Sequence, residues 1–191
     1  MKTRVAFFVA VVALLTACSS GKPNINYYQL SPAPTTQQVD LNLPTLFFET
    51  ISLVDYLKQT NLILANDSGQ LYVTRYHVWA EPLEQAIARS MVNHLNQSQQ
   101  KFRAQHQFKS SCGGQCYRVK LLVEQFYPTE SNQVIFAGKY QLIKDGKVIA
   151  QQDFNLQQTL KQDGYGAAVS SLHQLTIQLA SQIAQRLATV E

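Results

Sequence analysis

Hydrophobic and polar residues alternate in several short stretches of the first half of the chain, a pattern typical of β-strands. Segment 66–69, Asn-Asp-Ser-Gly, has the composition of a turn, so we expect the stretches on either side of it to form a hairpin. The strands predicted by this pattern are 27–30, 46–53, 61–65 and 70–76.

A change to a period of about four residues predicts the first helix. Glu81 and Pro82 suit its start, because proline at the first helical position loses no hydrogen bond and a carboxylate is favoured at the positive end of a helix. Hydrophobic residues then recur on one side until about residue 99, and 101–116 has the polar composition of a loop. The hydrophobic stripe is Leu83, Ile87, Met91 and Leu95.

From Tyr117 the period returns to two, which predicts a strand and then a hairpin of 134–142 with 148–156 around Asp145-Gly146. Asp163 is placed to cap a last amphipathic helix from about residue 165 to about residue 188. The predicted fold class is α+β, in two layers. An antiparallel-rich sheet carries two amphipathic helices on one face.

The first twenty residues carry an export signal. Lys2 and Arg4 precede an apolar run over 5–15, which as a helix reaches about 16 Å, half of the membrane's hydrocarbon thickness. Leu15-Thr16-Ala17-Cys18 then resembles the bacterial lipobox, in which the cysteine thiol is alkylated by diacylglycerol and becomes the new N-terminus. The alternative is an ordinary export signal with an incidental cysteine, but Leu15 fits the small-residue rule of such signals poorly.

These features divide the chain into a lipoprotein signal peptide (1–17), a lipid anchor and tether (18–26) and a single domain (27–191). The tether has linker composition and a fully extended length of about 26 Å, so it would hold the domain close to the bilayer. The formal net charge of +4 is spread thinly, which excludes a nucleic-acid footprint. A content of 46% hydrophobic residues predicts a folded core.

Two further cysteines, Cys112 and Cys116, enclose Gly-Gly-Gln in what we expect to be an oxidising compartment. A local disulfide between them is the favoured interpretation. The alternative is a redox or metal role with His106 as third ligand, but the pair lacks Cys-x-x-Cys spacing and a fourth ligand is not evident. The chain has no His-x-x-x-His pair and no Gly-x-Ser-x-Gly elbow, so we predict no catalytic residue, metal or cofactor.

Several segments together resemble the ABC-type transport auxiliary lipoprotein family, the PqiC-like proteins. They are Tyr-Tyr-Gln-Leu at 27–30, Leu-Val-Asp-Tyr-Leu at 53–57 and, above all, the run Arg75, Tyr76, His77, Val78, Trp79, Ala80, Glu81, Pro82, Leu83, with Ile87 and Arg89. We interpret Arg75, Tyr76, Trp79, Glu81, Pro82 and Leu83 as a mainly structural family motif, with Trp79 in the core.

The resemblance implies a non-enzymatic outer-membrane lipoprotein subunit of an MCE-type, PqiABC-like lipid transport system that contributes to envelope integrity. Ser19 after the cysteine is similar to lipoproteins sorted to the outer membrane. The implied partners are the membrane, through acylated Cys18, and an MCE-domain protein; a homo-oligomer is left open. Two other functions also stay open: a periplasmic thiol-disulfide or metal protein using Cys112 and Cys116, and a structural adapter of another envelope complex.

Overall fold

The computed structural model describes residues 24–30, 40, 42–98, 101–106 and 116–190. It contains eight strands, two α-helices and one short 3-10 helix within these residues. In chain order the elements are β1 (Asn26–Tyr28), β2 (Thr45–Leu53), η1 (Asp55–Leu57), β3 (Asn61–Ala65), β4 (Leu71–Trp79), α2 (Leu83–Ser98), β5 (Arg103–Gln105), β6 (Cys116–Pro128), β7 (Gln133–Lys144), β8 (Lys147–Thr159) and α3 (Tyr165–Val190).

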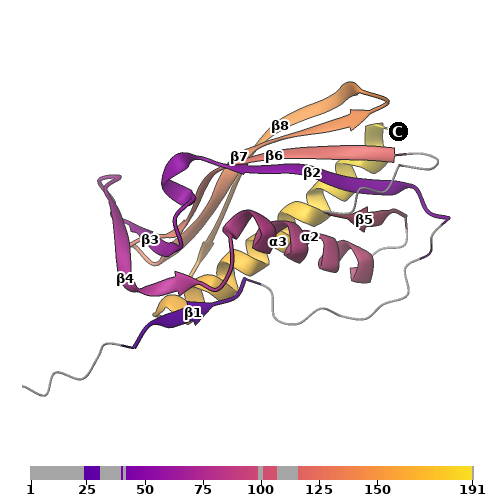
Figure 1. Ribbon diagram of the computed structural model, residues 1–191. Coiled ribbons are helices and arrows are strands. Elements are labelled where there is room, and N and C mark those ends of the chain that lie inside the picture. Colours follow the sequence, from indigo (N-terminus) through magenta and orange to yellow (C-terminus); the bar gives the residue numbers. More distant parts are fainter. Residues whose placement is uncertain (1–23, 31–39, 41, 99–100, 107–115, 191) are drawn as a thin grey trace, which may run out of the picture.

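The strands form two sheets rather than the one expected. The large sheet has the order β5-β2-β6-β7-β8, and the small sheet has the order β1-β4-β3. Both helices lie on the same side of the large sheet, and the small sheet lies at one end of the molecule, beside the N-terminal half of α3 (Figure 1). A single bridge between Ala65 and Thr129 connects the two sheets. The predicted α+β class is confirmed.

Both predicted hairpins are confirmed. They could be predicted because each is joined by a short turn with its own sequence signal. β3 pairs antiparallel with β4, and β7 pairs antiparallel with β8 over almost their whole length. In the second hairpin Asp145 and Gly146 have positive φ angles of 50° and 76°, the left-handed geometry that a tight turn between twisted strands requires.

Two local expectations were wrong. The expected loop 101–116 contains β5, which pairs in parallel with β2; the Arg103 N–H donates to the Pro44 carbonyl at 2.8 Å. β2 also runs parallel to β6, but β6, β7 and β8 pair antiparallel, so the large sheet is mixed and antiparallel-rich, as expected. Gly164, not Asp163, occupies the N-cap of α3, and its carbonyl accepts the Ala168 N–H at 3.0 Å.

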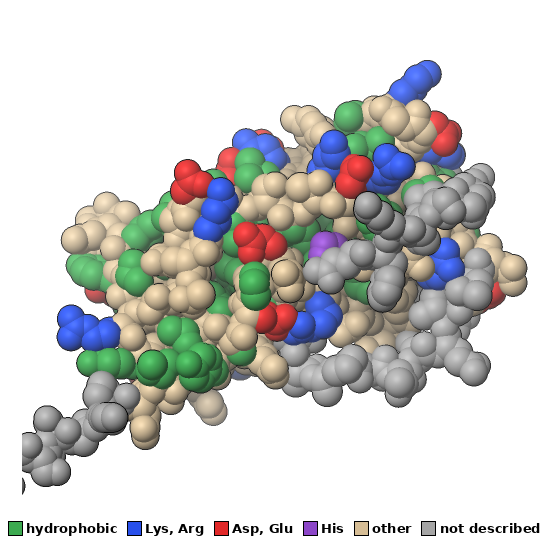
Figure 2. All heavy atoms as spheres, in the orientation of Figure 1, with side chains coloured by type: hydrophobic (Ala, Val, Ile, Leu, Met, Phe, Trp, Pro, Cys, Tyr) green, Lys and Arg blue, Asp and Glu red, His purple; other side chains and the backbone are tan. Residues whose placement is uncertain are grey.

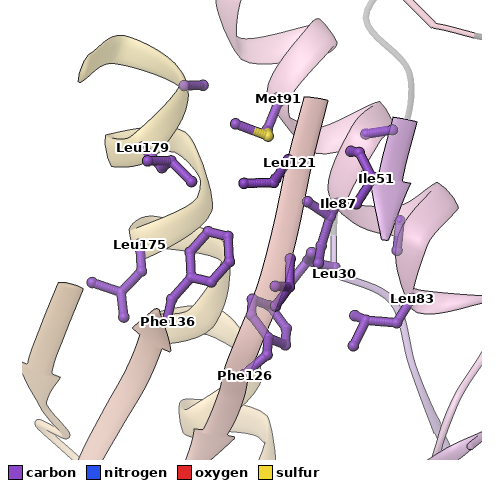
Figure 3. Packing of buried hydrophobic residues seen from close by; sticks show 14 of the residues in the cluster. Leu30, Ile51, Leu83, Ile87, Met91, Leu121, Phe126, Phe136, Leu175 and Leu179 are labelled. Carbon is purple, nitrogen blue, oxygen red and sulfur yellow. The ribbon is translucent and has the colours of Figure 1, made fainter. Parts of the chain in front are cut away.

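The core lies between the large sheet and the two helices. Leu83 and Ile87 of α2, and Leu175 and Leu179 of α3, point toward the sheet (Figure 3). The predicted stripe of α2 is fully buried. On the amphipathic helix α3 the buried stripe consists of Val169, Leu172, Thr176, Leu179, Ile183 and Leu187. None of the helices in the described part of the chain is long and apolar enough to cross a membrane.

A ladder of aromatic rings crosses this core from the small sheet to the edge of the large one. Trp79 of β4 lies 6.0 Å from Phe126 of β6, between ring centroids. Phe126 then meets Phe136 of β7 edge to face at 5.0 Å, and Phe136 meets Phe154 of β8 at 4.9 Å. The tilted contact between Trp79 and Phe126 joins the two sheets, and the edge-to-face pairs, which add to simple burial, continue it across the large sheet.

Candidate functional site

The family motif identified in the sequence forms the junction between β4 and α2. Trp79 is the last residue of β4 and is only 7% exposed, which confirms its expected place in the core. Leu83 begins α2 and is buried, whereas Arg75 and Tyr76 lie on the surface of β4. The motif therefore has a structural part and an exposed part.

An ion pair closes the junction. The guanidinium of Arg89 donates two hydrogen bonds to the two carboxylate oxygens of Glu81, and both side chains are partly buried. The hydrogen bonds from Glu81 raise the pKa of Arg89 above its usual value. Because Arg89 lies two turns into α2, this pair of parallel hydrogen bonds fixes the direction in which the helix leaves the strand. The carbonyl of Pro82 accepts the N–H groups of Gln85 and Ala86, which starts the helix.

Behind the junction, three aromatic side chains join β1, β4 and α3. His77 Nδ1 lies 2.8 Å from the hydroxyl of Tyr28, and the ring of His77 stacks on Tyr165 at 3.8 Å between centroids. Burial raises the pKa of Tyr28, with a smaller contribution from Tyr165. Sequence reasoning missed this cluster because its members are far apart in the chain and no shared pattern connects them.

A groove of about 660 Å³ runs between the C-terminal halves of α2 and α3. In it, His94 Nε2 lies 2.8 Å from Ser181 Oγ, a pairing that resembles a base beside a nucleophile. However, the Ser181 hydroxyl also lies 3.0 Å from the carbonyl of Ile177, which can only accept its proton, so this carbonyl competes with His94 for the hydroxyl proton. The lining residues are His94, Leu95, Ser98, Lys101, Phe102, Ser181, Ala184, Gln185, Ala188 and Thr189, a set without a carboxylate to orient the histidine.

Two histidines at the contact between α2 and α3 predict a pH-dependent stability. Burial lowers the pKa of His94, and burial together with the nearby His94 lowers the pKa of His173. The unfolded chain, with histidine pKa values near 6.5, then binds more protons than the folded one, so the free energy of unfolding falls as the pH drops from about 7 to about 5. Urea unfolding across this range is expected to show the loss.

The double variant His94→Gln with His173→Gln is the control for this effect, because glutamine retains hydrogen-bonding groups but does not titrate. Its stability is expected to depend less steeply on pH over the same range. An unchanged slope would mean that other groups cause the loss.

The predicted cysteine sites are only partly described. Cys18 and Cys112 lie outside the described residues, and Cys116 is the first residue of β6. The pairing of Cys112 with Cys116 therefore stays a prediction. His106, weighed as a third metal ligand, lies with Nδ1 3.0 Å from the carbonyl oxygen of Phe48. Within the described ranges, no three His, Cys, Asp or Glu residues are grouped to hold a metal ion.

Comparison with known proteins places the junction and the domain around it in a family. The profile described as "ABC-type transport auxiliary lipoprotein component" matches residues 28–184. The chain belongs to this family. The family resemblance drawn from the sequence is thereby confirmed, and the family is described as a transport component rather than as an enzyme.

Comparison with single proteins gives two relatives in sequence and two solved structures with a similar fold. The chain is 27% identical over 184 residues to the intermembrane transport lipoprotein PqiC of Escherichia coli K12, covering 95% of this chain and 96% of that protein. The PqiC protein of Shigella flexneri matches to the same extent. A crystal structure of an uncharacterized protein has a TM-score of 0.72 at 22% identity and covers 86% of this chain and 99% of its own. A Xanthomonas campestris protein has a TM-score of 0.60 at 18% identity, with 83% and 92% covered. The two structures support the fold alone.

Proposed function

We propose that this protein is the outer-membrane lipoprotein subunit of an MCE-type, PqiABC-like intermembrane lipid transport system that supports envelope integrity. The observation that carries the proposal is the family match over residues 28–184, directly behind a lipobox-like segment that ends at Cys18. The relative named as an intermembrane transport lipoprotein matches over nearly its full length, which supports the same placement.

In this function the protein acts by position rather than by chemistry. The acyl chains on Cys18 keep it on the membrane, since two or more chains anchor stably where a single chain binds only marginally. The tether limits the height of the domain above the bilayer. A transport partner that reaches the same membrane then meets many copies of this domain at high local concentration. Assembly is therefore favoured even if one copy binds the partner only weakly. We propose an MCE-domain protein as that partner, and a ring-like homo-oligomer as the form that meets it.

The anchoring step is tested by replacing Cys18 with Ser. The variant is expected to disappear from the outer-membrane fraction, because serine lacks the thiol that is alkylated. The N-terminal peptide of the wild-type protein is expected to carry acyl chains when analysed by mass spectrometry. An unmodified Cys18 in a protein that is free in the periplasm would overturn the proposal.

The other cysteines provide matched controls. Cys112→Ser and Cys116→Ser are expected to stay in the membrane fraction, and to lose some stability at most if the two thiols form a local bond. Loss of function in these variants with normal anchoring would instead support the thiol-based alternative. Cross-linking of the lipidated protein, followed by mass spectrometry, is expected to recover an MCE-domain protein.

A further inference from the structure

One face of the small sheet exposes hydrophobic side chains next to the N-terminal end of β1. Tyr27 is 69% exposed and pairs in register with Val78, which is partly exposed. Ile25 directly precedes β1, and Tyr76 lies two residues before Val78 in β4, so both flank the Tyr27–Val78 pair at the same end of the small sheet. Ile25 is 52% exposed and Tyr76 is 36% exposed. We call Ile25, Tyr27, Tyr76 and Val78 the outer face of the small sheet; Figure 2 shows hydrophobic side chains gathered over β1 and β4 at this end.

The opposite face of the same strands holds the outer face in place. Tyr28 and His77 interact with each other, His77 stacks on Tyr165 of α3, and Trp79 packs on Phe126 of the large sheet. These side chains alternate with those of the outer face along β1 and β4. The outer face therefore cannot turn inward to bury its side chains without breaking the aromatic packing behind it.

Charge on the small sheet also distinguishes this face from an ordinary surface. Across β1, β3 and β4 the one ionised side chain is Arg75, and the strands carry no carboxylate. The anionic phosphates of a lipid leaflet would therefore meet hydrophobic side chains and tyrosine hydroxyls, and no carboxylate of these strands would repel them. Tyrosine is the side chain that favours the boundary between headgroups and acyl chains, because its ring is apolar and its hydroxyl is polar.

The length of chain between the proposed anchor and this face limits what can cover it. Six residues separate Cys18 from Ile25, so the two Cα atoms are at most about 25 Å apart. An acylated Cys18 would thus hold Ile25 within one tether length of the bilayer at all times. Exposed hydrophobic patches of this kind mark interaction surfaces, and the surface that is always within reach is the membrane itself.

We infer that the outer face of the small sheet docks on the phospholipid bilayer and lies at the boundary between headgroups and acyl chains. This rests on the proposed anchoring at Cys18, which brings the face to the membrane. The anchor keeps the protein on the membrane, and the docked face fixes its orientation. The small sheet faces the bilayer, and the rest of the domain projects away from the leaflet. A fixed orientation would present the same surface to the transport partner in every copy.

The test uses a chain that has no anchor, so that its result is independent of acylation. Residues 18–191 carrying Cys18→Ser are mixed with vesicles of phosphatidylethanolamine and phosphatidylglycerol, and bound protein is measured by sedimentation. The Ile25→Ser, Tyr27→Ser double variant is expected to raise the apparent Kd at least about tenfold, a change of about 1.4 kcal/mol. The control Val148→Ser removes a side chain that is 54% exposed on β8, and it is expected to bind like the parent.

Three results would overturn the inference. The first is an unanchored chain that fails to sediment with vesicles at any lipid concentration, and the second is equal binding by the double variant and Val148→Ser. Light scattering is run on both variants as well; a smaller particle for the double variant alone would show that a second copy, not lipid, covers the face. Circular dichroism confirms that each variant is folded. Because the chain tested lacks the acylated thiol, a failure here leaves the test of Cys18 anchoring intact.

Discussion

Replacing Gly138 with Ala is expected to destabilise the protein by about 3 kcal/mol or more, the upper end of the cost of overpacking a core. Gly138 lies in the middle of β7, opposite an irregularity in β6 between Val123 and Gln125. A Cβ atom at this position would clash with the backbone oxygen of Leu122 and lie 3.2 Å from the ring of Phe154. The first of these contacts is with backbone, so relief requires the two central strands to separate.

Urea unfolding of purified protein, followed through the fluorescence of the single tryptophan, measures this loss. Gly166→Ala is the matched control, because an added Cβ there has no heavy atom within 4 Å and the residue lies in the first turn of α3. The control is expected to be as stable as the parent or slightly more stable. If Gly138→Ala unfolds at the same urea concentration as Gly166→Ala, the backbone at the bulge is not as close as the structure shows.

Gly138 also marks a limit of prediction from the sequence. The alternation in the predicted hairpin identifies β7 and β8 correctly, because each strand carries its own pattern and Asp145-Gly146 specifies the turn. The same pattern gives no sign that Gly138 must lack a side chain. That requirement comes from the bulge in β6, and the bulge depends on which strand pairs with which.

Pairing between distant segments explains the other differences. β1 pairs with β4 and β2 pairs with β6, in both cases in parallel. A parallel pair has no local turn, so its two strands are far apart in the chain and neither carries a signal for the other. β5 is three residues long and is held by backbone hydrogen bonds, with Asn96 of α2 bonding both backbone groups of Ala104. The two helices could be predicted without knowing what they pack on, since the hydrophobic stripe of each is visible in its own sequence.

In the candidate site, too, local features could be predicted and features that depend on distant pairing could not. Trp79 and Leu83 were recognisable as core because a large aromatic residue at a strand end, and a hydrophobic residue that begins a helical stripe, are both local features. The outer face of the small sheet was not recognisable. Alternation shows that Tyr27 and Tyr28 point to opposite sides, but only the pairing of β1 with β4 decides which of them is exposed.

Replacing Trp79 with Ala is expected to lower the free energy of unfolding by about 3–5 kcal/mol, the usual cost of removing a large buried aromatic side chain. The loss has two parts. One is the burial and cavity cost at a position only 7% exposed, and the other is the contact with Phe126 that connects the small sheet to the large one. Trp79→Phe keeps a ring at the same place, so its loss is expected to be clearly smaller.

Because Trp79→Ala removes the fluorophore, its stability is measured by far-ultraviolet circular dichroism in urea, together with Trp79→Phe and the parent. Tyr72→Ala is the control on the same strand; its side chain is exposed, and a change within about 0.5 kcal/mol is expected. Hydrogen exchange separates the two parts of the loss. If the ring joins the sheets, amides of β1 and β4 exchange faster in Trp79→Ala while those of β7 stay protected. Uniformly faster exchange would mean that Trp79 stabilises the whole core without any special role in holding the small sheet.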